Sequence, residues 1–165
     1  MIGRRYRPID APTATWRVSF QRLVTRNKVG RQLRAWRIRS RIMSWTPKQL
    51  ARIDAARELE IAVRSADGTL RRWTPIWVVH VHDDVYVRTW YRRGTGWFGH
   101  ALRSRRARVR VPGLEVDVRI EDVGVGSSGL RADVDGAYRD KYGGGSTGNM
   151  IGDEAAATTL RLVRE

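Results

Sequence analysis

The sequence contains no cysteine and no long apolar segment. Without cysteine, it can form neither disulfides nor a Cys-ligated zinc site. No apolar run approaches the roughly 18 residues that a membrane-spanning helix needs, and no signal-peptide core is present. We therefore expect a soluble, cytoplasmic protein, and 165 residues are enough for one domain with a tail.

Acidic residues are almost absent from the first quarter of the chain. Residues 1–42 contain 12 lysines and arginines but a single acidic residue, Asp10, whereas residues 43–165 contain 20 basic and 16 acidic residues. Most of the net charge of +15 therefore belongs to a basic N-terminal arm, which we expect to be disordered or partly helical. Residues 43–165 are predicted to form the folded domain, which is long enough to bury about two thirds of its unfolded surface.

Three interpretations of the basic arm remain open. Its arginines could bind nucleic acid or an anionic membrane surface through phosphate contacts. An arginine-rich, acid-poor N-terminus also resembles a targeting segment. We favour the third interpretation, in which the natural chain begins at Met43 and the arm is not native, because the arm lacks a motif that would read bases.

The domain has the patterns of a mainly β protein. Thr46, Pro47 and Gln49 form a capping box that predicts a helix ending near Arg57. Pro75 removes a hydrogen-bond donor from the middle of a long strand, which predicts a bulge or a bend there. Alternating apolar residues predict strands at 59–64, 70–82, 85–90, 107–111, 114–123 and 158–163, and helical patterns cover 97–105, 130–142 and 153–157. Six antiparallel strands and two to three flanking helices indicate an α+β fold in which a small split barrel closes its own edges.

Polar and cationic side chains interrupt the strands between residues 68 and 111. Arg71, Arg72 and Thr74 belong to one strand, and Arg88 and Thr89 belong to the next. A sheet rarely carries this much charge in its middle unless an anionic ligand lies against it. Arg71 or Arg72 could form a bidentate pair with a phosphate, but only one of them can point inward because side chains alternate along a strand. The alternative is a solvated strand face.

The other candidates also have structural alternatives. Stacking on an aromatic neighbour would explain Arg88, and β-propensity alone would explain both Thr74 and Thr89. Trp97 could donate its indole N–H to a ligand or pack at the start of a helix, and Trp77 could wall a pocket or fill the core.

Histidines offer little further chemistry. His80 and His82 are two residues apart on one strand face, but no third ligand follows at a suitable spacing, so we predict no metal site. His100, in the short helix after Trp97, is a weak candidate for proton donation to a substrate.

Several motifs resemble a family of small bacterial proteins of unknown function, and the match covers about Met43 to Arg164. The motifs are Trp45-Thr46-Pro47, Trp73-Thr74-Pro75-Ile76-Trp77-Val78-Val79 and Ala137-Tyr138-Arg139-Asp140-Lys141-Tyr142-Gly143.

More distantly, the middle third of the chain is similar to split β-barrel oxidoreductases that bind flavins or deazaflavins. Those proteins have an arginine, two residues, a proline with an aromatic-rich strand, a hairpin and a tryptophan-headed helix. The resemblance implies an FMN-binding-like fold, a homodimer, and hydride transfer between FMN or a deazaflavin and a small organic substrate. The cofactor-binding candidates are Arg71, Arg72, Thr74, Pro75, Trp77, Arg88, Thr89 and Trp97. The alternatives are a non-catalytic module for an anionic ligand and nucleic-acid association through residues 1–42.

Overall fold

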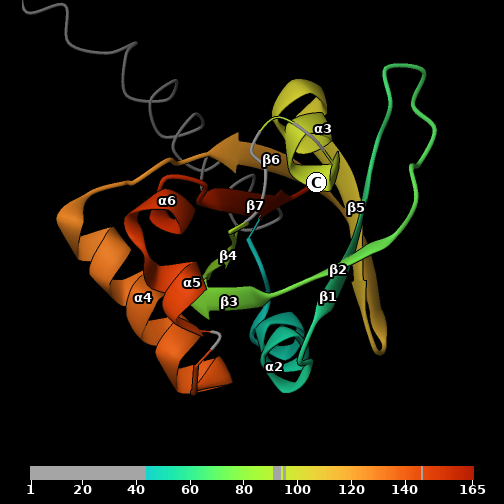
Figure 1. The fold of residues 1–165 in the computed structure, drawn as a ribbon. Helices are drawn as coiled ribbons and strands as arrows, with labels where there is room; N and C mark the ends of the chain where they lie inside the picture. Colours follow the sequence, from blue (N-terminus) through green and yellow to red (C-terminus); the bar gives the residue numbers. More distant parts are fainter. Residues whose placement is uncertain (1–43, 91–93, 95, 146) are drawn as a thin grey trace, which may run out of the picture. The chain divides into compact units, whose positions relative to one another are not determined.

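The computed structural model describes residues 44–90, 94, 96–145 and 147–165 (Figure 1). The predicted basic arm, residues 1–42, lies outside the described residues, and so does most of the loop at 91–96. No helix in the described part of the chain is long and apolar enough to cross a membrane.

The fold is one antiparallel sheet of seven strands with helices packed around it. The strands are β1 (Leu59–Val63), β2 (Thr74–Ile76), β3 (Val78–Val81), β4 (Asp84–Val87), β5 (Arg106–Val111), β6 (Leu114–Asp122) and β7 (Leu160–Arg164). The described helices are α2 (Pro47–Ala55), α3 (Gly96–Ser104), α4 (Ser128–Tyr142), α5 (Thr147–Ile151) and α6 (Asp153–Ala156). The predicted fold class is confirmed, with seven strands instead of six.

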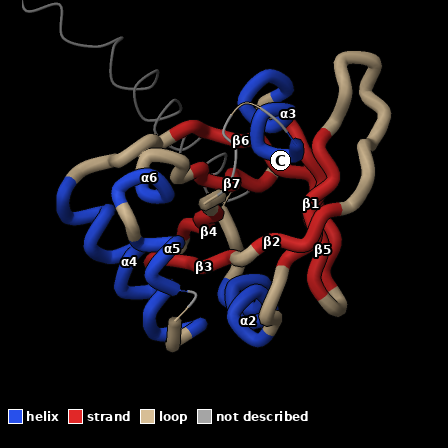
Figure 2. Tube along the Cα trace, in the orientation of Figure 1, coloured by secondary structure: helices blue, strands red, loops and turns tan. Residues whose placement is uncertain are grey.

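The sheet curls into a nearly closed barrel, because its two edge strands are joined through a single residue, Trp77. The strand order is β2-β1-β5-β6-β7-β4-β3, so β2 and β3 lie at opposite edges although only Trp77 separates them in sequence (Figure 2). The predicted continuous strand 70–82 is therefore wrong, because β2 pairs with β1 while β3 pairs with β4. Pro75 is tolerated inside β2 because β2 is an edge strand.

Two further boundaries differ from the predictions. Strand β4 ends at Val87 instead of residue 90, because Arg88 and Thr89 leave the ladder and bond to Thr158 and Thr159. Helix α5 was not predicted, since its sequence contains glycine and lacks a clear apolar stripe. The capping box at the start of α2 is present, with Thr46 and Gln49 each bonded to the other's backbone N–H.

Apolar side chains fill the barrel and a second layer outside it. Inward-facing residues of the strands, such as Ile61 and Leu160, form the main core, which α2 closes at one end and α3 at the other (Figure 1). A second cluster joins Val79 of β3 to Val134 of α4 and Met150 of α5. Strand β3 is therefore buried on both faces, which explains why it is apolar at consecutive positions.

The last turn of α4 holds the chain at the Trp77 break. The Lys141 ammonium donates hydrogen bonds to the carbonyl oxygens of Ile53 and Val78, both at 2.8 Å. The Tyr142 hydroxyl accepts the Val78 N–H at 2.9 Å, and its ring stacks on Trp77 with centroids 4.1 Å apart. Side chains thus satisfy the backbone groups of Val78 on the side away from β4, because β3 is an edge strand and has no neighbouring strand there. Lys141 and Tyr142, in the motif from 137 to 143, therefore have a structural explanation.

We predict that Lys141→Met lowers the free energy of unfolding by about 1–3 kcal/mol, because the Ile53 carbonyl loses the Lys141 donor and the Val78 carbonyl keeps only the longer bond from the Tyr142 hydroxyl at 3.1 Å. Urea denaturation followed by circular dichroism measures the change. Lys48→Met is the matched control, because Lys48 is exposed on α2. Equal stability of the two variants would contradict this role for Lys141.

Candidate functional site

A cleft of about 470 Å³ lies beside the Trp77 break, and we call it the tryptophan cleft. Its walls come from β2, the segment after β4, the first turn of α3, and α5. Its volume lies within the range of about 300–1,000 Å³ that is usual for small-molecule sites. The lining residues are Glu58, Pro75, Ile76, Trp77, Arg88, Thr89, Trp90, Trp97 and Met150.

The fold brings five of the eight predicted cofactor-binding residues into this cleft. Pro75, Trp77, Arg88, Thr89 and Trp97 all line it, although they come from three separate parts of the chain. The other three do not: Thr74 pairs with β1, Arg72 is exposed outside the lining, and Arg71 lines a different cavity.

Three indole rings give the cleft its aromatic character. Trp77 is fixed by its stacking on Tyr142, and Trp97 meets Phe98 edge to face at 5.5 Å. Trp90, which was not among the predicted site residues, is 61% exposed. An exposed tryptophan in a cleft offers a ligand a large apolar surface, and the ligand can contact it without any rearrangement of the core. The cleft can therefore accept a flat aromatic ligand.

Arg88 lines the cleft, but its guanidinium is committed to internal bonds. Nε donates to the Thr159 hydroxyl at 2.9 Å, and Nη1 donates to the Met150 carbonyl at 3.0 Å and to Asp135. The ring of Tyr138 lies under the guanidinium, with its centroid 5.6 Å away. Arg88 therefore lines the cleft as a cofactor-binding candidate whose charge is already engaged, and turning it toward a ligand would take from Asp135 its buried partner.

Asp135 was missed by sequence reasoning, although a signal for it exists. It lies three residues before Tyr138 on α4 and is buried on the same side. A carboxylate on an apolar helix stripe requires a buried cation. That requirement predicts an arginine partner, but helical spacing cannot show which of the 32 basic residues supplies it.

Thr89 and His80 are also engaged within the fold. The Thr89 N–H donates to the Thr158 hydroxyl at 3.0 Å, and that hydroxyl lies 2.8 Å from the Thr89 carbonyl oxygen. The His80 ring lies 2.7 Å from Asp54. Among the described residues, no group of three or more His, Asp or Glu side chains is arranged to hold a metal ion.

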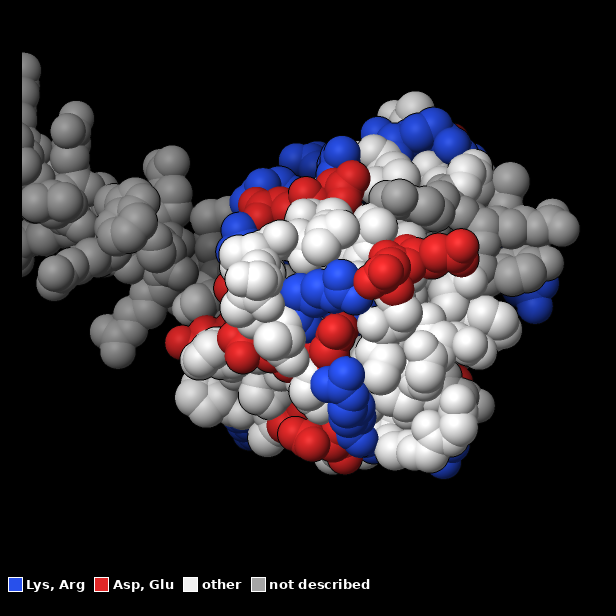
Figure 3. Space-filling model, turned by 60° about the vertical axis from the view of Figure 1, so that its left-hand side comes forward, with Lys and Arg blue, Asp and Glu red and all other residues white. Residues whose placement is uncertain are grey.

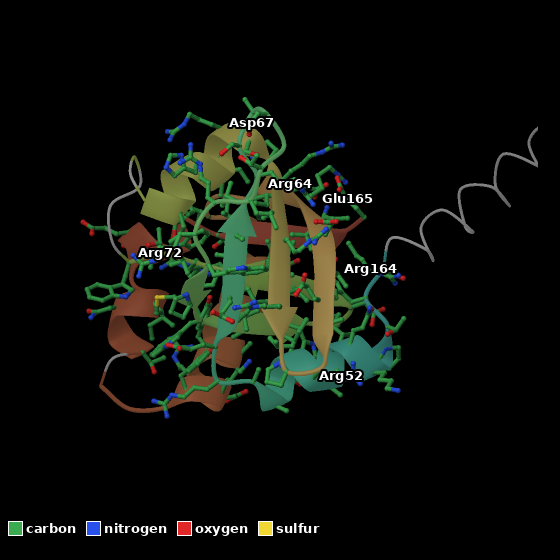
Figure 4. All side chains as sticks on the ribbon, turned by 90° about the vertical axis from the view of Figure 1, so that its right-hand side faces the viewer. Arg52, Arg64, Asp67, Arg72, Arg164 and Glu165 are labelled. Atoms are coloured by element: carbon green, nitrogen blue, oxygen red, sulfur yellow. The ribbon has the colours of Figure 1, made fainter. Side chains whose placement is uncertain are left out.

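A second cavity, of about 490 Å³, lies between the tip of the β1–β2 hairpin, the second half of α3 and the start of β5. We call it the cationic cavity. Figure 4 shows Arg64 and Asp67 at this end of the molecule, with Arg72 away from them. The lining residues are Arg64, Ser65, Ala66, Gly68, Arg71, His100, Arg103, Ser104 and Arg106.

The cationic cavity differs in charge from the face drawn in Figure 3 and from the paired arginines of the sheet. On the face drawn in Figure 3, acidic and basic side chains are interspersed. Arginines along the sheet are likewise paired, as Arg108 with Asp117 and Arg110 with Glu60. The cavity instead gathers four arginines and one histidine, and none of its lining residues is acidic. Sequence reasoning singled out Arg71 and, as a proton donor, His100, but not the other three arginines, because helical and strand patterns cannot show that they meet at one cavity.

Asp117 has the most strongly stabilised carboxylate in this region. Hydrogen bonds from Arg108 and then from Arg64 lower its pKa from the ordinary value of 3.8 to about 2. Through Arg64, this carboxylate anchors one wall of the cationic cavity to β6.

Comparisons with known proteins agree with this architecture. A family model described as "Uncharacterized protein conserved in bacteria (DUF2255)" matches residues 49–162. No curated protein sequence matches the chain.

Three solved structures are similar to this chain at low identity, and the first of them supports the fold. A candidate 5-nitroimidazole antibiotic resistance protein from Bacteroides thetaiotaomicron is 9% identical, with a TM-score of 0.50 over 74% of this chain and 82% of that one. A FAD-binding protein from Mesorhizobium loti is 14% identical, with a TM-score of 0.44 over 74% and 91%. An F420 reductase is 13% identical, with a TM-score of 0.38 over 70% and 90%.

We predict that Arg88→Met lowers the free energy of unfolding by about 3 kcal/mol, the low end of the range for breaking a buried pair, because Asp135 loses its buried partner and keeps only the longer contact to Arg131 at 3.7 Å. Arg119→Met is the control: Arg119 forms an exposed pair with Glu121, worth about 1 kcal/mol or less. The double variant Arg88→Met/Asp135→Leu should recover much of the loss, since it removes both charges. Denaturant unfolding measures all three. A loss for Arg88→Met no larger than that of the control would contradict the internal role of Arg88.

The low pKa of Asp117 predicts an acid-dependent loss of stability. Because folding lowers this pKa, the ionised carboxylate stabilises the folded state above about pH 4, and its contribution disappears as the pH falls from about 4 to about 2. We expect about 1 kcal/mol after solvent screening, since a third of the side chain is exposed. The measurement compares unfolding free energies of Asp117→Asn and the wild type across this range. Asp83→Asn, in an exposed turn, should retain the full wild-type dependence.

Proposed function

We propose that this chain, which belongs to the DUF2255 family of uncharacterised bacterial proteins, binds the ring system of a flavin or deazaflavin in the tryptophan cleft. We further propose that it acts as an oxidoreductase on a small organic substrate. The observation that carries the proposal is the convergence of Trp77, Trp90 and Trp97 on one cleft at the edge of a split barrel.

The residues of the cleft fit a planar tricyclic ring. The volume of the cleft suits a ligand of the size of this ring, and the faces and edges of indole rings pack well on conjugated rings. The described lining contains no arginine free to hold a phosphate, because the Arg88 guanidinium bonds to Asp135. The fit therefore extends to the ring, and any charged tail has to reach beyond the cleft.

The chain's own groups would orient a ligand and exclude water. Trp77 is held by Tyr142 and can act as a fixed wall, whereas Trp90 at 61% exposure can cover a bound ring. The Arg88 network keeps α4 and α5 against the barrel, so that Met150 forms part of the lining. A flavin or deazaflavin, when bound, would supply the hydride-transfer chemistry, which asks little more of the protein than positioning and a dry site.

A non-catalytic module for an anionic ligand is the second candidate. The cationic cavity favours it, because a ligand could bind there without any redox chemistry. The homodimer implied by the resemblance belongs to the first proposal, and light scattering on the purified protein can check it. Nucleic-acid association through residues 1–42 stays a prediction, which binding assays with and without the arm can test.

The test is a titration of the full chain with FMN, FAD and an oxidised deazaflavin, followed by cofactor and tryptophan fluorescence. We expect saturable binding of at least one, and Trp90→Ala should weaken it about 3- to 10-fold, because one ring contact is worth about 0.5–1.5 kcal/mol. Trp73→Ala is the control: Trp73 lies under Arg110, 4.1 Å from its guanidinium carbon, outside the cleft. Failure of all three cofactors to bind would refute the redox proposal.

A further inference from the structure

The charges of the cationic cavity are incompletely neutralised. Arg64 is paired with Asp117 at 2.6 Å, and Arg106 meets Glu165 at 3.3 Å. Arg71 and Arg103 have no carboxylate within ion-pair distance in the described part of the chain. Since both side chains face the same cavity from different elements, the cavity has an excess of positive charge.

His100 marks the point where these two cations converge. Arg103 Nη2 lies 2.9 Å from His100 Nδ1, and both residues belong to α3. Arg71 lines the same cavity from the β1–β2 hairpin. Burial lowers the pKa of His100, and the charges of Arg71 and Arg103 lower it further. The two guanidinium groups that lower this pKa indicate a region of positive potential, and none of the described side chains that line the cavity is an anion.

One acidic residue lies nearby without lining the cavity. The Asp67 carboxylate accepts hydrogen bonds from the Thr69 N–H at 3.0 Å and from its hydroxyl at 2.8 Å, and it also interacts electrostatically with Arg71. These bonds stabilise the hairpin turn, in which Gly68 has a φ of +84° that favours glycine. Asp67 therefore helps to shape the cavity but holds Arg71 through no direct ion pair.

We propose that the cationic cavity binds the phosphoryl group of a small molecule. Guanidinium groups bind tetrahedral oxyanions with paired hydrogen bonds, and Arg71 and Arg103 can supply these donors from two sides. Arg64 is held by Asp117 and by the Gly68 carbonyl at 3.0 Å, so that this wall is already ordered before a ligand arrives. The volume of about 490 Å³ suits a small phosphorylated molecule.

Helix α3 contributes to both cavities. Trp97 in its first turn lines the tryptophan cleft, whereas His100, Arg103 and Ser104 line the cationic cavity. The phosphoryl group therefore has two possible sources: the tail of a ligand whose ring occupies the cleft, or a separate phosphorylated molecule. The site itself does not depend on the proposed ring binding.

The experiment titrates the full chain with inorganic phosphate at constant ionic strength and follows the imidazole signals by NMR. The sequence has only three histidines, so His80 and His82 serve as internal controls, and His100→Gln identifies the third signal. We expect saturable movement of the His100 signal and an upward shift of its pKa, because a bound anion offsets the neighbouring cations.

Three variants distinguish phosphate binding in the cavity from non-specific attraction to the protein's net positive charge. Arg71→Gln and Arg103→Gln should each weaken phosphate binding about tenfold, the effect of losing roughly 1.4 kcal/mol, and both residues are exposed enough to be replaced without unfolding. Arg139→Gln, an exposed change of equal charge on α4, should leave binding unchanged. A His100 response that does not saturate, or that is the same in all three variants, would overturn the proposal.

Comparison of FMN with riboflavin identifies the source. If FMN binds about tenfold more tightly than riboflavin and Arg103→Gln removes the difference, the phosphoryl group is the tail of the ring ligand. If inorganic phosphate binds while FMN gains nothing over riboflavin, the source is a separate molecule. If phosphate binds but neither the flavins nor the deazaflavin do, the redox proposal fails and the anion site stands.

Discussion

The passage of the chain from one edge of the sheet to the other through Trp77 is the constraint on which the rest of the structure depends. Strands β2 and β3 pair with different neighbours, so the sheet must curl until its edges approach. The backbone around Val78 then lacks a neighbouring strand on one side. Lys141 and Tyr142 supply the missing partners, and the same geometry leaves a cleft between the strand ends and α3. The chain break at Trp77 therefore accounts both for the closed shape of the sheet and for the presence of the cleft.

The buried Arg88–Asp135 pair holds the helices beside the barrel. It joins the segment after β4 to α4, and the Met150 carbonyl brings α5 into the same network. A buried ion pair seldom stabilises a fold more than apolar packing would, but it allows few alternative arrangements. We infer that it fixes the position of the helical layer that completes the cleft wall. A cationic side chain that directly follows a strand can thus be structural, even where it also lines a cleft.

Helix α3 contributes to two cavities of different character. Its first turn supplies Trp97 to the aromatic cleft, and its second half supplies His100 and Arg103 to the cationic cavity. Most arginines of the sheet are neutralised by carboxylates on adjacent strands, as Arg108 is by Asp117. The excess charge is concentrated where the hairpin tip meets α3, since the elements that meet there supply arginines and no lining carboxylate. A molecule with a flat ring and an anionic group would match both features, and this combination is what the proposals for the two cavities have in common.

Local patterns in the sequence determined the α2 cap, the inward faces of β6 and β7, and the presence of a tryptophan-headed helix, because these depend on residues a few positions apart. They also indicated five residues that line the cleft. Only the tertiary structure decided that the long strand breaks at Trp77, that Arg88 bonds to Asp135 47 residues away, and that Arg71 lines the same cavity as His100 and Arg103. Such pairings depend on which strands become neighbours, and strand alternation specifies a face of the sheet but not the partner across from it.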